Sequence, residues 1–265
     1  MLVTDIDGTL LDDGGRLSRS NREALGQLIE RGVHVTLATG RTLAASRELA
    51  ARIGIRLPLI TCNGSQVVDP SGAVLMERRL APETVDDVVD LAGRLGLCGF
   101  AYLTKGVVPV AGGERRADHL LAEDRARLLA PVTRPGPDAP WYAEGGGIKL
   151  LLLGEPAAAD ALERAAAAGR QPFSAVRSGP DCVEVMAPGV SKATGLRFLS
   201  SRLGLPLERV VAVGNAGNDL EMVRQAGVGV AVATAEPQLL ALADYVAPPH
   251  WADGVAHTVH RYFPS

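Results

Sequence analysis

Residues 1–9 read MLVTDIDGT, and the order of apolar and acidic residues in this stretch decides the expected fold. The strand-like run at 1–4 predicts a short buried strand at 2–6. Asp5 and Asp7 come at its end, two residues apart, so both side chains can point to the same side. Gly8 then allows the chain to turn sharply. At the carboxyl edge of a parallel sheet, this turn would face the usual ligand site.

Two neighbouring carboxylates can divide chemical work between them. One can act as an ionised nucleophile while the other shuttles a proton. The backbone amides that follow Asp5 can surround a phosphate, and carboxylate and carbonyl oxygens suit a hard metal ion. A plain acidic turn after a strand explains the DxD pattern equally well, so its chemical meaning depends on what other segments contribute.

The first 70 residues alternate short apolar runs with amphipathic segments, which is typical of βαβ units in a parallel sheet. Ser20 and Glu23 form a candidate capping box for a helix that would stop at Gly32. We further expect strands at 33–37 and 59–62, a helix at 42–53, and a hairpin with turns at 63–64 and 70–72. The alternation resumes after Ser191, with strands at 210–213, 228–232 and 245–247 and helices ending at 203, 226, 242 and 262.

The character of the chain changes between residues 80 and 187. Helices are expected there at 82–95, 117–129 and 156–168, with strands at 99–103, 148–153 and 182–186. The Pro- and Gly-rich segment 131–147, which includes Trp141, is expected to be a flexible surface loop. We therefore predict an α/β protein with a doubly wound parallel-sheet (Rossmann-like) core at 1–79 and 188–265 and an inserted α/β domain at 80–187.

Three further segments carry residues suited to binding a phosphate. The TGR segment at 39–41 follows the second expected strand, where a hydroxyl and backbone amides can hold phosphate oxygens. Lys192, near a helix start, can neutralise phosphoryl oxygens. The GNAGND segment at 214–219 adds oxygen ligands for a hard cation. Singly, each is also explained as a helix cap or a solvated residue, but together with DxD they favour phosphoryl chemistry.

The ordered set DIDGT, TGR, SK after an insertion, and GNxxND resembles the motifs of the haloacid dehalogenase (HAD) superfamily. It is most similar to the Cof-type phosphatases, which carry a large α/β cap of type IIB between their second and third motifs. The resemblance covers nearly the whole chain, and CNG at 62–64 and GVGVA at 227–231 are secondary matches. It implies a HAD catalytic core and an inserted cap domain that selects the substrate.

The resemblance also implies a role for each motif residue. Asp5 would attack phosphorus to give an aspartyl-phosphate, and Asp7 would protonate the leaving alkoxide and later deprotonate the attacking water. Thr39 and Lys192 would bind the transferring phosphoryl group. The implied cofactor is Mg²⁺, held by the Asp5 carboxylate, the Asp7 carbonyl oxygen and, in the fourth motif, Asn215 and Asp219.

Asn215 departs from the family pattern, which usually has Asp at this position as a direct metal ligand. An amide oxygen can still bind Mg²⁺, but one negative charge is lost. We therefore expect a lower metal affinity than in a typical member, with partial compensation by Asp219, and an Asn215→Asp variant should need less magnesium.

Several residues beside the expected site are candidates for contact with the substrate. They are Gly8, Gly40, Arg41, Asn63 and Asn218. Structural roles in turns explain Arg41, Asn63 and Asn218 about as well, so the sequence leaves both interpretations open for these three.

Composition narrows the function further. A formal net charge of -3, with Arg residues scattered among acids, argues against a nucleic-acid partner. The three cysteines form no CxxC pair, which disfavours a zinc site or a disulfide framework and fits a cytoplasmic location. No stretch is apolar enough to span a bilayer, so we expect no membrane association. The sequence does not indicate an oligomeric state.

The function expected from these features is Mg²⁺-dependent hydrolysis of a small phosphorylated metabolite, specifically a sugar-phosphate-like phosphomonoester. Two alternatives stay open. One is a sugar phosphomutase-like phosphoryl transferase, which would yield a product phosphorylated elsewhere. The other is a weakly active protein that binds a phosphate ligand, motivated by Asn215 and recognised by stabilisation without turnover.

Overall fold

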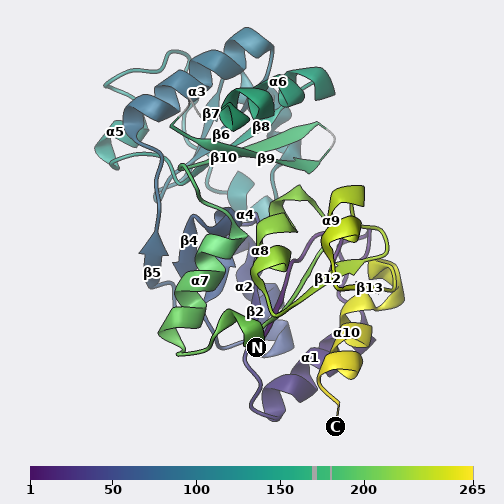
Figure 1. Cartoon of the computed structure of the whole chain (residues 1–265). Helices are drawn as coiled ribbons and strands as arrows, with labels where there is room; N and C mark the ends of the chain where they lie inside the picture. Colours follow the sequence, from purple (N-terminus) through teal and green to yellow (C-terminus); the bar gives the residue numbers. More distant parts are fainter. Residues whose placement is uncertain (169–171, 180, 265) are drawn as a thin grey trace. The chain divides into compact units, whose positions relative to one another are not determined.

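A computed structural model describes residues 1–168, 172–179 and 181–264 of the chain (Figure 1). The chain divides into two compact units, each of which is described separately. The first unit combines Met1–Met76 with Ser191–Ser265, and the second unit is the continuous segment Glu77–Val190. None of the helices in these described ranges combines the length and hydropathy required to cross a bilayer.

The first unit is built on a five-stranded parallel sheet with the order β13-β12-β11-β1-β2. A second, smaller sheet has the order β3-β4-β5. The strands are β1 (Leu2–Thr4), β2 (Val35–Leu37), β3 (Leu59–Thr61), β4 (Gln66–Val68), β5 (Val74–Glu77), β11 (Val211–Gly214), β12 (Val228–Val232) and β13 (Tyr245–Ala247). The helices are α1 (Arg19–Glu30), α2 (Leu43–Ile53), α7 (Lys192–Arg202), α8 (Leu220–Gln225), α9 (Pro237–Leu242) and α10 (Gly254–Tyr262), with short 3-10 turns η1 (Cys62–Gly64), η3 (Leu207–Arg209), η4 (Gly217–Asp219) and η5 (His250–Ala252).

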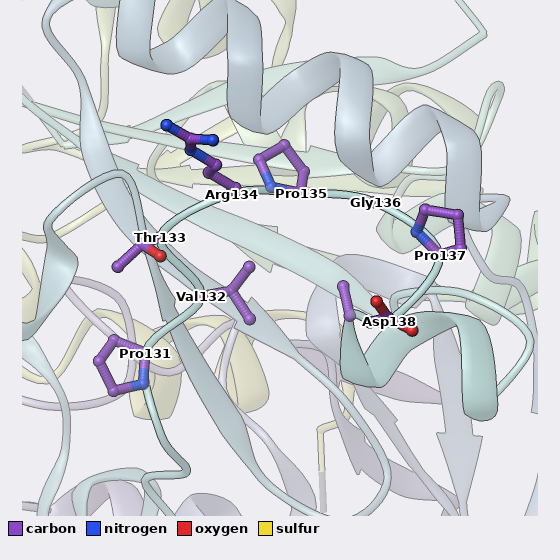
Figure 2. Close-up of a pocket in the computed structure, with 9 residues that line it drawn as sticks. Pro131, Val132, Thr133, Arg134, Pro135, Gly136, Pro137 and Asp138 are labelled. Atoms are coloured by element: carbon purple, nitrogen blue, oxygen red, sulfur yellow. The ribbon is translucent and has the colours of Figure 1, made fainter.

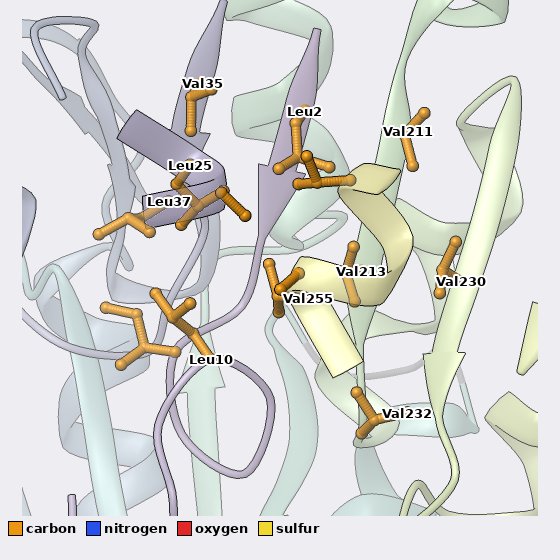
Figure 3. Close-up of a cluster of buried hydrophobic side chains, with 14 of the residues drawn as sticks. Leu2, Leu10, Leu25, Val35, Leu37, Val211, Val213, Val230, Val232 and Val255 are labelled. Carbon is orange, nitrogen blue, oxygen red and sulfur yellow. The ribbon is translucent and has the colours of Figure 1, made fainter. Parts of the chain in front are cut away.

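Successive strand residues of this sheet pack on opposite faces, which is the doubly wound arrangement. Leu2 and Val213 belong to one buried cluster, which includes residues of α1, α2 and α10 (Figure 3). Val3 and Ala212, their chain neighbours, belong to another cluster with residues of α7 and α8. Because side chains alternate along a strand, an apolar run buried on both faces is what a covered parallel sheet requires. The predicted α/β fold with a central parallel sheet is confirmed.

The first helix starts earlier than the sequence pattern suggested. Its N-cap is Ser18, whose hydroxyl accepts a hydrogen bond from the Asn21 amide at 3.0 Å. The expected capping residue, Ser20, lies inside the helix, and Glu23 forms an exposed pair with Arg19 instead of closing a capping box. The prediction was wrong because Ser18 also has a side chain able to cap, and the sequence spacing alone did not rank the two serines.

The second unit contains a five-stranded sheet with the order β7-β6-β8-β10-β9, in which neighbouring strands are antiparallel. Helices α3 and α6 contribute to a separate hydrophobic core with the sheet. The strands are β6 (Cys98–Tyr102), β7 (Val107–Val110), β8 (Lys149–Leu153), β9 (Ser174–Gly179) and β10 (Cys182–Met186). The helices are α3 (Pro82–Leu95), α4 (Ala122–Arg125), α5 (Pro140–Ala143) and α6 (Pro156–Ala167), with the 3-10 turn η2 (Gly113–His119).

Two expectations for the second unit were wrong. The helix expected at 117–129 is broken into η2 and the four-residue α4. The segment 131–147 contains α5, and Trp141 is fully buried there, with its indole donating a hydrogen bond to Asp86 Oδ1 at 2.9 Å. The preceding residues 131–139 curve around a cavity of about 420 Å³ (Figure 2). Tertiary packing of the aromatic ring overrides the local Pro and Gly signal.

Candidate active site

The carboxyl ends of three adjacent parallel strands meet at one edge of the first unit's sheet. Asp5 follows β1, and its amide donates to the carbonyl of Val213 in β11 at 2.9 Å. On the other side of β1, the amide of Ala38 donates to the carbonyl of Thr4 at 3.0 Å, and Thr39 comes next in the chain. Sheet hydrogen bonding therefore continues up to the predicted site residues and fixes their backbones relative to one another.

Lys192 is the centre of the site. It is the first residue of α7, is fully buried, and its Nζ donates to Asp5 Oδ1 at 2.6 Å and to Asp219 Oδ1 at 2.7 Å. Asp5 is 5% exposed and Asp219 is 0% exposed. A charge removed from water in this way requires charged partners. The contact joins positions 5, 192 and 219, which lie far apart in the sequence.

Burial sets the electrostatics of this contact. It raises the pKa of the Asp5 carboxyl to about 7, against the opposing effect of the Lys192 ammonium, and the carboxylates of Asp219 and Asp7 add to the rise. For Lys192, burial alone would lower the pKa, but the carboxylates of Asp219 and Asp5 hold it above its usual range. The site thus has a permanent cation beside a carboxylate whose ionisation depends on its surroundings.

The second oxygen of Asp219 organises the loop after β11. Asp219 Oδ2 accepts hydrogen bonds from the amides of Asn215 at 2.9 Å and Ala216 at 3.2 Å. Both carboxylate oxygens of Asp219 therefore already have protein partners, the other one being Lys192. The side chain fixes the loop that presents Asn215.

Asp7 differs from Asp5 in its surroundings. Its side chain is 61% exposed and is bound by Arg41, which donates from Nε to Oδ2 at 2.8 Å and from Nη2 to Oδ1 at 2.5 Å. A two-point contact between a guanidinium and a carboxylate fixes the orientation of both groups. The Asp5 carboxylate is thus buried and bound by Lys192, while the Asp7 carboxylate is exposed to solvent and bound by Arg41.

Gly8 lets the fourth motif approach the first. Its φ is +69°, and a Cβ at this position would lie 2.5 Å from Asn215 Nδ2. Next to it, Thr9 Oγ1 donates to Asn215 Oδ1 at 3.0 Å. Thr9 is a site residue that the sequence reasoning did not single out, although it is part of the DIDGT motif. Both ends of the Asn215 amide therefore lie against the motif, Nδ2 beside Gly8 and Oδ1 on the Thr9 hydroxyl.

Thr39 and Asn63 are joined through the backbone, because the Asn63 amide donates to the Thr39 carbonyl at 2.9 Å. Thr39 Oγ1 accepts from the Arg41 amide at 3.1 Å, which leaves its hydroxyl hydrogen available for another acceptor. Asn63 Oδ1 in turn accepts from Asn218 Nδ2 at 3.1 Å. All the residues proposed from the sequence for catalysis, substrate contact and metal binding, including Gly40, belong to the first unit.

Oxygen atoms dominate the possible metal donors at this edge. Within the residues that the structure describes, no group of three or more His, Cys, Asp or Glu side chains could hold a metal ion. A metal ion could instead be held by a set that contains one carboxylate. Its members are the Asp5 carboxylate, the Asp7 backbone carbonyl and the Asn215 amide oxygen. Such a set fits Mg²⁺, which is commonly bound by one or two carboxylates and completes its shell with water and phosphate oxygens.

Known proteins resemble this chain over almost its entire length. The family model described as haloacid dehalogenase-like hydrolase matches residues 2–259. A Bacillus subtilis (strain 168) protein named 5-amino-6-(5-phospho-D-ribitylamino)uracil phosphatase YcsE is 29% identical, covering 99% of this chain and 95% of its own. An HMP-PP phosphatase of Cronobacter sakazakii is 31% identical, and the match covers 89% of this chain and 85% of that protein. The crystal structure of a haloacid dehalogenase-like hydrolase from Bacteroides thetaiotaomicron has a TM-score of 0.79 and 26% identity, and the match covers 99% of this chain and 98% of that chain.

Proposed function

Because the chain belongs to the haloacid dehalogenase-like hydrolase family, we propose that it is a Mg²⁺-dependent phosphatase that acts on a small phosphomonoester through an aspartyl-phosphate. The observation that carries the proposal is the buried contact of Lys192 with Asp5 and Asp219 at the carboxyl edge of the sheet. A carboxylate and an ammonium held together there can receive a phosphoryl group, with the cation facing its anionic oxygens.

In the first step, an oxygen of Asp5 attacks phosphorus and the bond from phosphorus to the ester oxygen breaks. Asp7 gives its proton to the leaving alkoxide, so the alcohol departs neutral. Its side chain is 61% exposed, so it can reach a leaving group that enters from solvent. Lys192 and the Thr39 hydroxyl bind the non-bridging oxygens of the transferring group.

In the second step, Asp7 takes a proton from a water molecule, and the water oxygen attacks phosphorus. The bond from phosphorus to Asp5 breaks, which releases inorganic phosphate and regenerates the carboxylate. Arg41 orients the Asp7 carboxyl group through its two-point contact. Bound Mg²⁺ would supply charge neutralisation of the phosphoryl oxygens.

For the metal we propose Asp5, the Asp7 carbonyl and Asn215 as protein ligands. Asp219 was also expected among them, but its side chain is 0% exposed, with Oδ1 on the Lys192 ammonium and Oδ2 on two loop amides. We therefore assign Asp219 an indirect role, in which it holds Lys192 and the loop that carries Asn215. Mg²⁺ itself is proposed from the all-oxygen donor set.

The second unit is proposed to be the cap that selects the substrate. Its segment, Glu77–Val190, is inserted between the parts of the chain that carry Thr39 and Lys192. The substrate is proposed to be a phosphorylated sugar or polyol, or a similar metabolite. The name of the Bacillus subtilis relative, which specifies a phospho-D-ribityl group, supports this class.

The test is phosphate release from an aryl phosphate and a panel of sugar phosphates, with and without Mg²⁺. Asp5→Asn should lower turnover by at least about 10³-fold, because it removes the nucleophile. Asp90→Asn, the same substitution at an exposed position of α3, is the matched control and should retain activity. Equal turnover by both variants would exclude Asp5 as the nucleophile.

The single-carboxylate donor set favours one second candidate, a protein that binds a phosphate ligand with weak activity. In that case inorganic phosphate would raise the melting temperature of the wild-type chain, while no phosphomonoester in the panel would be hydrolysed. A sugar product phosphorylated at a new position, in place of free phosphate, would instead indicate a phosphomutase-like transferase.

A further inference from the structure

His250 is a buried titratable side chain that the proposed mechanism does not use. It lies in η5, is 7% exposed, and has a partner on each ring nitrogen. Nε2 is 2.8 Å from Asp13 Oδ1, and Nδ1 is 2.9 Å from Thr234 Oγ1. The ring of Trp251 packs edge-on against the imidazole, with the ring centroids 4.9 Å apart. The imidazole therefore joins three separate segments of the first unit.

Both contacts can form whether the ring of His250 is neutral or protonated. The ionised Asp13 carboxylate can only accept, so Nε2 carries the hydrogen of that bond. Nδ1 of a neutral ring accepts the hydroxyl hydrogen of Thr234, whereas Nδ1 of a protonated ring donates to Thr234 Oγ1. The link between the three segments therefore does not depend on the charge of the ring.

The first partner, Asp13, lies in a hairpin that directly follows the DIDGT motif. An antiparallel bridge between Leu11 and Leu17 closes this hairpin, residues 11–17. The amide of Leu11 also donates to the carbonyl of Ile6 at 3.0 Å, which closes the turn that contains Asp7. Because the turn and the hairpin share a residue, the position of the hairpin constrains the turn that carries Asp7.

The second partner, Thr234, lies in the loop between β12 and α9. Two residues later, the amide of Glu236 donates to the carbonyl of Asn215 at 2.8 Å. Asn215 in turn accepts a hydrogen bond from the hydroxyl of Thr9. The loop that His250 binds through Thr234 is therefore tied to the backbone of a proposed metal ligand.

The segment that carries His250 is closely packed, while both of its partners lie at the surface. A Cβ on Gly254 would lie 2.3 Å from the carbonyl oxygen of Pro248, so the chain around η5 packs tightly on the start of α10. The Asp13 side chain is 83% exposed and Thr234 is also exposed, so water could satisfy their polar atoms. Neither partner requires the imidazole for that purpose. The contacts instead fix the positions of two surface loops.

We propose that His250 is a positioning residue for the phosphatase reaction, which clamps the hairpin 11–17 to the loop that is bound to Asn215. The clamp restricts the motion of the turn that carries Asp7 relative to Asn215. This inference rests on the proposed phosphatase function. A general acid works only within hydrogen-bond reach of the leaving oxygen, so a looser turn should lower kcat more than it raises KM.

The first experiment measures kcat and KM of the full chain for an aryl phosphate. His250→Ala should lower kcat by roughly 10- to 100-fold, as expected for the loss of a hydrogen bond to a charged group, and leave KM within about threefold. His250→Gln should restore kcat to within about threefold of the wild type, because its planar amide also has one donor side and one acceptor side. A side chain that only fills space would not be rescued in this way.

The matched control is Arg16→Ala in the same hairpin. The Arg16 side chain is 82% exposed and pairs with Asp12 at 3.0 Å, without contact to His250. Since exposed ion pairs contribute little, this variant should keep kcat within about twofold. Asp13→Ala should lower kcat in the wild-type background and have no further effect in His250→Ala, because it acts through the same contact.

The second experiment follows trypsin cleavage after Arg16 in the native chain and requires no turnover. Proteolysis follows the fraction of molecules in which the hairpin is open. His250→Ala should therefore accelerate this cleavage by roughly 10- to 100-fold, and His250→Gln should stay near the wild-type rate. Cleavage after Arg94, which is exposed in α3 of the second unit, should be unchanged and serves as the internal reference.

The inference is overturned if a folded His250→Ala protein keeps the wild-type kcat, or if its cleavage after Arg16 is no faster. It is also overturned if His250→Gln melts like the wild type but turns over as slowly as His250→Ala. Should His250→Ala fail to fold, Asp13→Ala carries the same two measurements from an exposed position. A wild-type chain that hydrolyses no ester would refute the phosphatase proposal, while the cleavage rates would still test the clamp.

Discussion

At the scale of single residues, Asn215 is the position where this chain departs most from the chemistry that its motifs imply. Its amide oxygen accepts a hydrogen bond from Thr9 and carries no charge, so Asp5 is the one carboxylate in the proposed metal donor set. Asn215→Asp should lower the Mg²⁺ concentration for half-maximal turnover by at least about tenfold, because an added carboxylate attracts the cation. Metal titration of both proteins measures this, and an unchanged Mg²⁺ requirement would contradict the proposed ligand set.

Cys182 gives a prediction about pH at the same scale. Burial raises the pKa of its thiol to about 11, and the charge of Glu184 adds to the rise. Because the thiol form does not react, a raised pKa protects Cys182 at every pH below about 11. At pH 8 only roughly a thousandth of the Cys182 side chains are thiolate. Alkylation of Cys182 by iodoacetamide should therefore be about 100-fold slower in the native protein than in urea at pH 8.

Peptide mass spectrometry at a series of pH values follows that reaction. In the native protein the Cys182 rate should keep rising with pH toward 11, instead of levelling near pH 9 as an ordinary thiol does. Rapid labelling of native Cys182 at pH 8 would show that the thiol is more accessible and more acidic than its surroundings imply.

At the scale of elements, the turn η1 requires a glycine at position 64, whereas helix α1 has room for a larger residue at Gly26. Gly64→Ala would add a Cβ 2.0 Å from the Ser191 carbonyl oxygen at a φ of +86°. It should destabilise the protein by roughly 2–5 kcal/mol, from the left-handed conformation and the overpacking together. The loss of stability should be accompanied by loss of activity, since the turn packs on the backbone that carries Lys192.

The matched control is Gly26→Ala, in the middle of α1, where an added Cβ meets no atom within 4 Å. This change should stabilise the protein by about 0.5–1 kcal/mol, because alanine loses less backbone entropy in a helix. Urea unfolding of the two variants measures both effects. A Gly64→Ala protein as stable as the wild type would mean that the close packing of η1 on α7 is not required.

At the scale of the whole molecule, the second unit is one continuous segment with its own sheet and hydrophobic core. We expect residues 77–190, expressed alone, to unfold in a single cooperative urea transition. Trp141→Ala should cost that segment about 3–5 kcal/mol, because the ring is fully buried in its core. Absence of a cooperative transition in the isolated segment would show that its fold depends on the rest of the chain.

Local sequence patterns predicted many elements and the family. Helix α3 and strands β10, β12 and β13 have the expected bounds, since apolar periodicity and flanking Gly and Pro are read over a few residues. The DIDGT, TGR and GNxxND motifs also identified the family, which the match over residues 2–259 confirms. Local patterns failed at 117–129, where helix-forming residues are divided between η2 and α4.

Only the tertiary structure decided which side chains of the site contact one another. The sequence determined that carboxylates and amides follow strands of the parallel sheet and that a lysine lies near a helix start after the insertion, and a parallel sheet brings its strand ends to one edge. It did not determine that both oxygens of Asp219 are used by protein groups, or that Asp7 is held by Arg41. These contacts depend on the directions of side chains from distant segments, which become fixed only when the sheet order and packing are set.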